Sequence, residues 1–258
     1  METLVVGAGE MGRWVADTLL ASTGPADASV AFTDHDPAVA ADAASTRPGA
    51  GSVPTDAEAS FDLVCLAVPM SAVPAAVATY ADRADGAVVD VSGEMTDAVA
   101  ALREHAPDRE RASFHPLFAP PRVPGNVAAV IDAAGPHVTA LVDAIEGGGN
   151  VVVEPTAAEH DRAMETVQAG AHAAVLAWRL AGDDVREEFH TPVSNALADV
   201  ADTVTEGAPE VYAEIQHAFD GAECVADAAR EIADADPERF AELYERARGD
   251  REGRERHG

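Results

Sequence analysis

The chain has 258 residues, of which 46 are acidic and 17 are basic, so its formal net charge at pH 7 is −29. Every basic residue is arginine, and the absence of lysine excludes lysine Schiff-base chemistry. So acidic a composition argues against a nucleic-acid or anionic membrane partner. Together with the missing lysine, it predicts a halophilic protein, because concentrated salt screens the repulsion between surface charges.

The sequence gives no sign of export, membrane insertion or metal binding. No segment is apolar for long enough to span a bilayer, and the first residues read as a strand rather than a signal peptide, so we expect a cytoplasmic protein. Cys65 and Cys224 lie far apart, without metal or redox partners nearby in the sequence. The spacing of the nine histidines resembles no zinc site, and we predict no metal.

The pattern of the sequence changes near residue 155. Before it, apolar segments of strand length alternate with alanine-rich helical stretches, which predicts a mostly parallel sheet. The expected strands are residues 3–7, 29–34, 62–68, 87–91, 112–116, 126–132 and 150–155. After it, the chain reads as helix with breaks at Gly182, Thr191-Pro192, 207–209 and Asp236-Pro237. We predict an α/β protein with a Rossmann-type doubly wound domain over 1–155 and an all-helical domain over 156–258.

A glycine motif follows the first expected strand. In LVVGAGEMG, Gly7 permits a tight turn, Gly9 lets a pyrophosphate approach the backbone, and Gly12 allows close packing of helix on strand. The second expected strand ends in Asp34, whose carboxylate suits the ribose 2′-hydroxyl of NAD and would repel the 2′-phosphate of NADP. We therefore predict an NAD site that also includes the loop residues Glu10 and Met11.

One histidine lies where an apolar segment meets a proline-rich stretch. In RASFHPLFAPPRVPG, Pro116 stiffens the backbone directly after His115, so we expect this ring on a rigid bend at the end of a strand. A neutral histidine near its ordinary pKa can accept a proton at neutral pH. His115 is therefore the candidate general base.

Four stretches together resemble the prephenate dehydrogenase family, and they cover most of the chain. They are LAVPM (66–70), HPLFAP (115–120), EHDRAMETVQAGAH (159–172) and TPVSNALADVADTVTEGAPEVYAEIQ (191–216). The resemblance implies that His115 is catalytic, and that the substrate pocket includes His160, His172 and the helix carrying Asn195. It also implies that the nicotinamide is bordered by three residues: Ala67, Val68 and Pro69.

The chain departs from the family pattern at three places. The family places a serine that bonds the catalytic histidine where this chain has Gly93, and Ser92 lies one position early, so Ser92 is a candidate for that catalytic role. Ser194-Asn195 stand where the family carries an arginine that binds a substrate carboxylate. Ala119 replaces the glycine of the histidine-proline motif. The arginines that could bind the carboxylate instead are Arg122, Arg162, Arg179 and Arg186.

The function implied by the resemblance is NAD-dependent oxidative decarboxylation of prephenate to 4-hydroxyphenylpyruvate, in tyrosine biosynthesis, by a homodimer. Arogenate dehydrogenase is one alternative. Another is a catalytically impaired NAD-binding regulatory protein, which the displaced serine and missing arginine would favour. A third is a different oxidoreductase on the same two-domain plan, but that group usually depends on a lysine and this chain has none.

Overall fold

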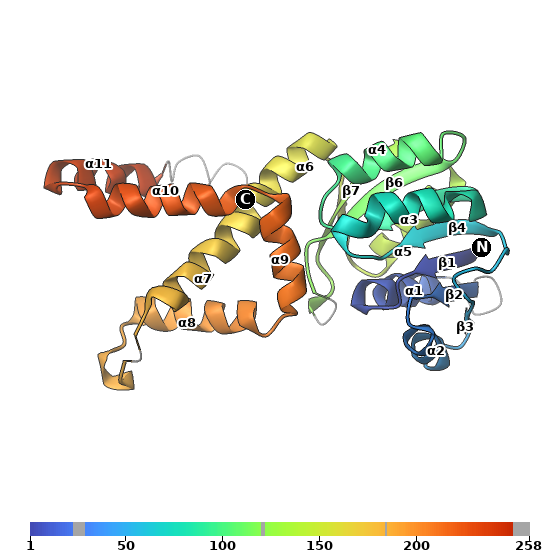
Figure 1. Ribbon diagram of the computed structural model, residues 1–258, viewed down its shortest axis with the longest axis horizontal. Helices are drawn as coiled ribbons and strands as arrows, with labels where there is room; N and C mark the ends of the chain where they lie inside the picture. Colours follow the sequence, from blue (N-terminus) through green and yellow to red (C-terminus); the bar gives the residue numbers. More distant parts are fainter. Residues whose placement is uncertain (23–28, 120–121, 184, 250–258) are drawn as a thin grey trace. The chain divides into compact units, whose positions relative to one another are not determined.

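The computed structural model describes residues 1–22, 29–119, 122–183 and 185–249, and it divides them into two compact units, 1–163 and 164–258 (Figure 1). The sequence predicts a domain boundary at 155, whereas the first compact unit also holds most of α6 (Ala157–Met164). This helix begins where the sequence predicts, since the backbone N–H of Glu159 donates to Thr156 Oγ1 at 3.2 Å.

The first unit is built on an eight-stranded sheet in the order β3-β2-β1-β4-β5-β6-β7-β8. Neighbouring strands are parallel except for β6 and β7, which are antiparallel. The strands are β1 (Glu2–Val6), β2 (Ser29–Thr33), β3 (Ala50–Ser52), β4 (Phe61–Leu66), β5 (Ala84–Val91), β6 (Glu110–Pro116), β7 (Asn126–Ala133) and β8 (Val151–Val153). This mostly parallel sheet confirms the predicted Rossmann-type fold, and β3 alone was not expected.

Helices cover both faces of the sheet because successive strand residues point to opposite sides. Val5 of β1 packs with α1 (Glu10–Ser22), α2 (Pro37–Ser45) and α5 (Pro136–Gly147). Its neighbours Leu4 and Val6 pack on the other side with α3 (Val73–Tyr80) and α4 (Thr96–His105). Two buried clusters result, and the carboxyl ends of the central strands are left to carry functional groups.

The second unit is helical over its described residues. Its helices are a π-helix over Glu165–Gly170, α7 (Ala171–Ala181), α8 (Pro192–Thr205), α9 (Pro209–Ala218), α10 (Gly221–Asp234) and α11 (Pro237–Arg248). The four predicted breaks fall between these helices. A further break at Phe219 and Asp220 was not predicted, because no proline or glycine precedes it.

Gly221, the first residue of α10, packs directly against the π-helix. A Cβ at this position would lie 2.0 Å from the Glu165 carbonyl oxygen and 2.5 Å from the Gly170 nitrogen, and both are backbone atoms that cannot rotate away. We expect Gly221→Ala to lower the free energy of unfolding by about 1–3 kcal/mol in a denaturant titration. Gly182→Ala is the control, since its nearest contact would be 3.6 Å away. Equal stability of the two variants would contradict this packing.

Candidate active site

The glycine loop between β1 and α1 has the geometry that each of its three glycines was predicted to need. Gly7 has a φ of +96°, which side-chain-bearing residues rarely adopt. A Cβ on Gly12 would lie 2.0 Å from the Gly7 carbonyl oxygen, so only glycine allows helix and strand to pack this closely. A Cβ on Gly9 would meet nothing within 4 Å. The backbone at Gly9 is thus open to an approaching phosphate group, at the N-terminus of a helix.

Asp34 lies directly after β2 and contacts this loop. Its Oδ2 accepts the backbone N–H of Ala8 at 2.8 Å, and its Oδ1 accepts that of Asp36 at 3.0 Å. The carboxylate therefore fixes the glycine loop and the turn that follows β2. Glu10 is exposed and Met11 is half-buried at the start of α1.

The segment after β4 lies beside the glycine loop. The N–H of Ala67 donates to the Val6 carbonyl at 2.7 Å, and a Cβ on Gly7 would lie 2.2 Å from the Ala67 carbonyl oxygen. Val68 is half-buried and Pro69 is exposed. The structure thus brings together the predicted cofactor residues of both segments at the carboxyl ends of β1 and β4.

His115 lies within β6, where it pairs with Ala128 of β7, and its side chain is buried. The expected bend is therefore wrong, because strand β6 continues through Pro116. Proline fits at this strand end because the pairing with β5 stops at Phe114, so Pro116 does not need a backbone N–H for a hydrogen bond to β5. A Cβ on Gly93 would lie 3.7 Å from His115 Nε2 and 2.7 Å from Met70 Sδ. The ring thus lies near Gly93, just beyond the end of β5, where the Met70 side chain from the segment after β4 also lies.

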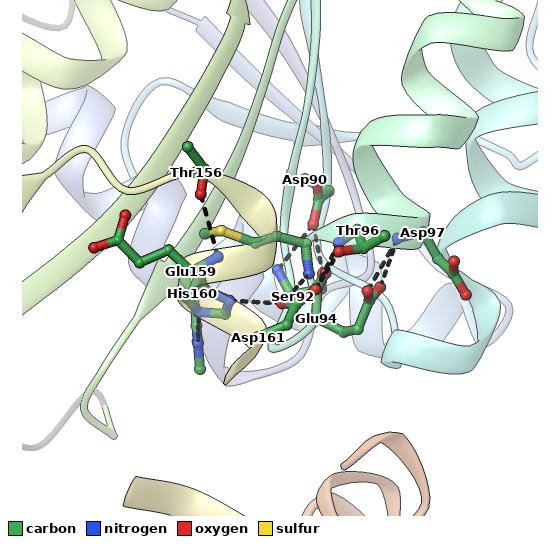
Figure 2. Close-up of polar contacts among 11 residues, drawn as sticks. Asp90, Ser92, Glu94, Thr96, Asp97, Thr156, Glu159, His160 and Asp161 are labelled. Atoms are coloured by element: carbon green, nitrogen blue, oxygen red, sulfur yellow. Dashed lines mark hydrogen bonds and ion pairs between the residues drawn. The ribbon is translucent and has the colours of Figure 1, made fainter. Parts of the chain in front are cut away.

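A chain of hydrogen bonds joins His115 to α6. His115 Nδ1 lies 2.9 Å from His160 Nε2, and His160 Nδ1 lies 2.8 Å from Asp161 Oδ1. The His160 ring is almost fully buried, with 1% of its side chain exposed. Figure 2 shows His160 beside Asp161, whose carboxylate reaches Thr96 at the start of α4. The resemblance implies that His160 belongs to the substrate pocket, whereas in the structure its ring nitrogens contact the side chains of His115 and Asp161.

Asp161 is held as a carboxylate by several donors. Its oxygens accept the backbone N–H groups of Met95 and Thr96 at 3.1 and 3.0 Å, and the Thr96 hydroxyl at 2.5 Å. Partial burial opposes ionisation, but the hydrogen bonds from His160, Thr96 and these amides lower the pKa of Asp161 to about 2. The carboxylate also occupies the N-terminus of α4, where the helix dipole favours negative charge.

These contacts determine where the ring protons lie. Because the Asp161 carboxylate can only accept, the Nδ1 of a neutral His160 carries its proton and Nε2 is left as an acceptor. His115 Nδ1–H then donates to His160 Nε2, and His115 Nε2 carries no proton. The unprotonated nitrogen of His115 is the one on the side of Gly93, which is the arrangement that a general base requires.

Burial changes the expected ionisation of His115. Desolvation and the neighbouring charge of His160 lower the pKa of His115 to about 3, although Asp161 opposes this. The expectation of an ordinary pKa is therefore wrong. His115 is neutral throughout the physiological range, so a proton that it accepts is not readily retained on the buried ring.

Ser92 does not make the contact that its predicted role requires. Its Oγ lies 2.6 Å from Asp90 Oδ2 and 3.0 Å from the Glu94 carbonyl oxygen, so it holds the turn after β5 (Figure 2). The position next to His115 Nε2 is that of Gly93, which has no hydroxyl. Burial raises the pKa of Asp90 to about 6, with hydrogen bonds from Ser92 opposing it. Sequence reasoning missed Asp90 and Glu94, which have no local motif.

Glu94 is a second carboxyl group close enough to Asp161 for the two charges to interact. Partial burial and the charges of Asp161 and Asp97 raise the pKa of Glu94 to about 7, although the backbone N–H of Asp97 donates to it and opposes the shift. A negative group that titrates near neutral pH therefore lies next to the Asp161 carboxylate.

Two predicted substrate residues lie in the second unit. His172 of α7 packs edge-on against Tyr212 with ring centroids 4.8 Å apart, and burial lowers its pKa. Its Nδ1 is buried without a hydrogen-bond partner among the described residues. Asn195 is exposed in the first turn of α8.

The four candidate arginines have different surroundings. Arg179 is paired with Asp202 at 2.7 Å, and the guanidinium of Arg186 lies over the Phe189 ring. Arg122 and Arg162 are exposed, lie in the same unit as His115, and form no ion pair within the described residues. They remain the candidates for a substrate carboxylate in that unit.

The described residues include neither a cluster of metal ligands nor a membrane-spanning helix. No group of three or more histidine, cysteine, aspartate or glutamate side chains there could hold a metal ion. No helix in the described ranges is both long enough and apolar enough to cross a membrane.

Comparison with known proteins gives the family. The 4-amino-4-deoxyprephenate dehydrogenase of Streptomyces pristinaespiralis is 34% identical over 269 residues, which cover 95% of this chain and 89% of the relative. Prephenate dehydrogenase from Aquifex aeolicus, solved with hydroxyphenyl propionate and NAD+, is 16% identical with a TM-score of 0.72 over 97% of this chain and 92% of that one. Synechocystis arogenate dehydrogenase is 14% identical with a TM-score of 0.64, over 98% and 99% respectively.

No protein-family model matches the chain. The two structural similarities establish the fold, and the 34% identity extends over nearly the whole sequence. The chain belongs to the prephenate dehydrogenase family.

Proposed function

We propose that this protein is an NAD-dependent prephenate dehydrogenase that uses His115 as its general base. The observation that carries the proposal is the hydrogen-bond chain from Asp161 through His160, which leaves His115 Nε2 unprotonated beside Gly93, just beyond the end of β5. An impaired regulatory protein has no need of a buried base with a fixed tautomer. Membership of the prephenate dehydrogenase family also supports an active dehydrogenase.

The dinucleotide site consists of the glycine loop, Asp34 and the segment after β4. Gly9 leaves room for the pyrophosphate, and the amides at the start of α1 supply donors for it. The carboxylate of Asp34 favours NAD over NADP because it would repel a 2′-phosphate. Ala67, Val68 and Pro69 border the nicotinamide in this proposal. When bound, NAD supplies the acceptor for the hydride that leaves C4 of the substrate ring.

In this proposal His115 accepts the hydroxyl proton of the substrate and later returns it. As the hydride leaves C4, the O–H bond at C4 breaks and its proton moves to His115 Nε2. The C1 carboxylate then leaves as carbon dioxide, and its bonding electrons make the ring aromatic. The ring oxygen takes the proton back, so the phenol product forms with no net proton released. The protein thus has to accept one proton and return it.

A dianionic substrate also needs cationic or donor groups, since a desolvated carboxylate without partners is costly. We assign this work to Arg122 and Arg162, with His172 and Asn195 as further substrate-binding residues. We expect Arg162→Gln to raise KM for the substrate at least about 10-fold with little change in kcat, because a carboxylate contact made equally in ground and transition states affects binding alone. Steady-state kinetics measure this, and an unchanged KM would exclude Arg162.

A second candidate substrate is 4-amino-4-deoxyprephenate, which the name of the 34% identical relative favours. An amino group at C4 also has to give a proton to a base as the ring is oxidised, and His115 Nε2 suits this role equally. Arogenate differs instead at the side chain, away from C4. The three substrates thus share the reacting ring and the same base.

Comparing kcat/KM for prephenate, arogenate and 4-amino-4-deoxyprephenate, each with NAD and with NADP, tests the proposal. We expect turnover of prephenate with NAD, followed at the nicotinamide absorbance in molar salt. A higher kcat/KM for the amino compound would transfer the assignment to that substrate. NAD binding without turnover of any of the three would favour the regulatory alternative.

The pH dependence follows from the shifted pKa values. Because the pKa of His115 lies near 3, the rate loss that an ordinary histidine gives below pH 6.5 should be missing. Glu94 loses its proton as pH rises through about 7, next to Asp161 and Asp97, and the added negative charge stabilises positive charge on the histidines. We expect kcat/KM to rise by less than about tenfold through this range. The rise should vanish in Glu94→Gln, and its persistence would contradict the assignment.

Three further properties belong to this proposal. The net charge of −29 and the absence of lysine support function in concentrated salt, in the cytoplasm. Exposed apolar side chains on the helices of the second unit support a homodimer. They include Val167, Leu180, Val193, Val211, Ile232 and Phe240. Light scattering in molar salt tests the dimer, and a monomer at micromolar concentration would exclude it.

A further inference from the structure

The backbone of Ala8, in the glycine loop, is bonded at both of its polar groups by side chains. Its N–H donates to Asp34 Oδ2 at 2.8 Å, and its carbonyl oxygen accepts from Arg13 Nε at 2.8 Å. Ala8 itself is fully buried. It lies between Gly7 and Gly9, so the two side chains together fix the middle of the loop that the dinucleotide is expected to contact.

The bond from Arg13 also sets the direction of the next amide. The peptide bond between Ala8 and Gly9 is trans, and a planar trans peptide directs its C=O and its N–H in opposite directions. Because the Ala8 carbonyl points to the Arg13 guanidinium, the Gly9 N–H points away from it. Among the described residues, the Gly9 N–H has no hydrogen-bond acceptor, and a Cβ on Gly9 would meet nothing within 4 Å. This donor is thus available to a ligand.

A glycine at this position makes the peptide unit easy to reverse. Reversal changes ψ of Ala8 and φ of Gly9, and glycine adopts positive φ about as readily as negative φ. A reversed unit would turn the Ala8 carbonyl oxygen, which carries partial negative charge, toward a bound phosphate. The hydrogen bond from Arg13 opposes this reversal, because the guanidinium N–H needs an acceptor and the Gly9 N–H is a donor.

We propose that Arg13 is a positioning residue for the dinucleotide, which holds the Gly9 N–H in the orientation that binds the pyrophosphate. This inference rests on the proposed NAD site. Arg13 acts through the Ala8 carbonyl rather than by touching the cofactor. Its Nη2 also lies 2.9 Å from Asp42 of α2. Since 65% of the Asp42 side chain is exposed, we expect that ion pair to contribute little.

Arg13→Met removes the donor to the Ala8 carbonyl while keeping a long side chain in its place. Asp42→Asn is the first control, because it removes the exposed ion pair and leaves the bond from Arg13 Nε. Arg47→Met is the matched control. Arg47 lies just after α2, pairs with Asp17 of α1 at 2.6 Å and donates to a helix carbonyl at 2.9 Å, outside the glycine loop.

The first measurement is calorimetric titration of each protein with NAD, ADP and adenosine in molar salt. In Arg13→Met we expect the Kd values for NAD and ADP to rise about 10-fold, as for the loss of one hydrogen bond, and that for adenosine to change less than about twofold. Adenosine has no phosphate, so it does not use the Gly9 N–H. Both controls should match the wild type. An equal loss for adenosine would reveal general damage to the site and would overturn the inference, as would unchanged NAD affinity.

The second measurement uses the wild type, so it stands even if Arg13→Met fails to fold. In protein labelled with nitrogen-15 glycine, the Gly9 amide signal is the one missing from Gly9→Ala, which should fold because a Cβ there meets nothing. We expect ADP to shift the Gly9 amide proton downfield and adenosine to leave it in place. No shift with ADP would overturn the inference.

These binding measurements need no turnover, so they separate the inference from the proposed reaction. A wild type that binds NAD and ADP but oxidises no substrate would refute the reaction alone. A wild type that binds neither NAD nor ADP would refute both the reaction and the role of Arg13.

Discussion

His115→Asn is expected to lower kcat by about 10²- to 10⁴-fold while NAD still binds with its normal affinity. The asparagine amide can replace Nδ1–H as the donor to His160, so the local structure should survive. It has no group in the place of Nε2, the nitrogen that accepts the substrate proton. Loss of the base with retention of the fold should therefore affect the chemical step alone.

Turnover measured at the nicotinamide absorbance, with NAD affinity measured by calorimetry, checks this result. His105→Asn is a suitable control, since His105 is exposed in the last turn of α4. If His115→Asn kept near-normal turnover and His172→Asn abolished it, the base would lie on α7 and the assignment to His115 would be wrong.

The second large effect concerns the glycine loop, where substitutions of Gly9 and Gly12 should both abolish NAD binding but should differ in their effect on stability. Gly9→Leu should abolish NAD binding and leave stability unchanged, because a Cβ at Gly9 meets nothing within 4 Å in the protein but would fill the approach to the pyrophosphate. Gly12→Ala should lose NAD binding and also lower the free energy of unfolding by about 1–3 kcal/mol, since its Cβ would lie 2.0 Å from the Gly7 carbonyl oxygen.

Calorimetric titration with NAD and thermal unfolding, both in molar salt, separate the two cases. The expected pattern is a stable Gly9→Leu without affinity and an unstable Gly12→Ala without affinity. A Gly9→Leu protein that binds NAD as tightly as the wild type would show that the pyrophosphate does not approach the backbone at Gly9.

The sequence predicted the features that depend on local pattern. Apolar strands, helix breaks at proline and the strand-loop-helix context of Gly7, Gly9 and Gly12 are encoded by neighbouring residues, and the structure reproduces each of them. Strand β3 escaped prediction because its residues, Ala50–Ser52, are small and carry no apolar alternation. Its place at the sheet edge depends on pairing with β2, which local sequence does not report.

The features that escaped prediction in the active site depend on tertiary contacts. His115 and His160 are 45 positions apart, and nothing in either segment indicates that their rings meet. The low pKa of His115 results from burial, which the sequence around a proline-rich stretch did not suggest. The resemblance makes Ser92 a candidate because it lies one position from the family's serine, but the backbone turn after β5 directs its hydroxyl to Asp90 and leaves Gly93 facing His115.

The most direct test of the proposed chemistry is the ratio of reduced nicotinamide to carbon dioxide formed from prephenate in one reaction. Oxidation coupled to loss of the C1 carboxylate predicts one equivalent of each per substrate consumed, at equal initial rates, with both lost in His115→Asn. Reduction of NAD without matching carbon dioxide would identify an ordinary hydroxyl dehydrogenase on the same fold and would contradict the proposal.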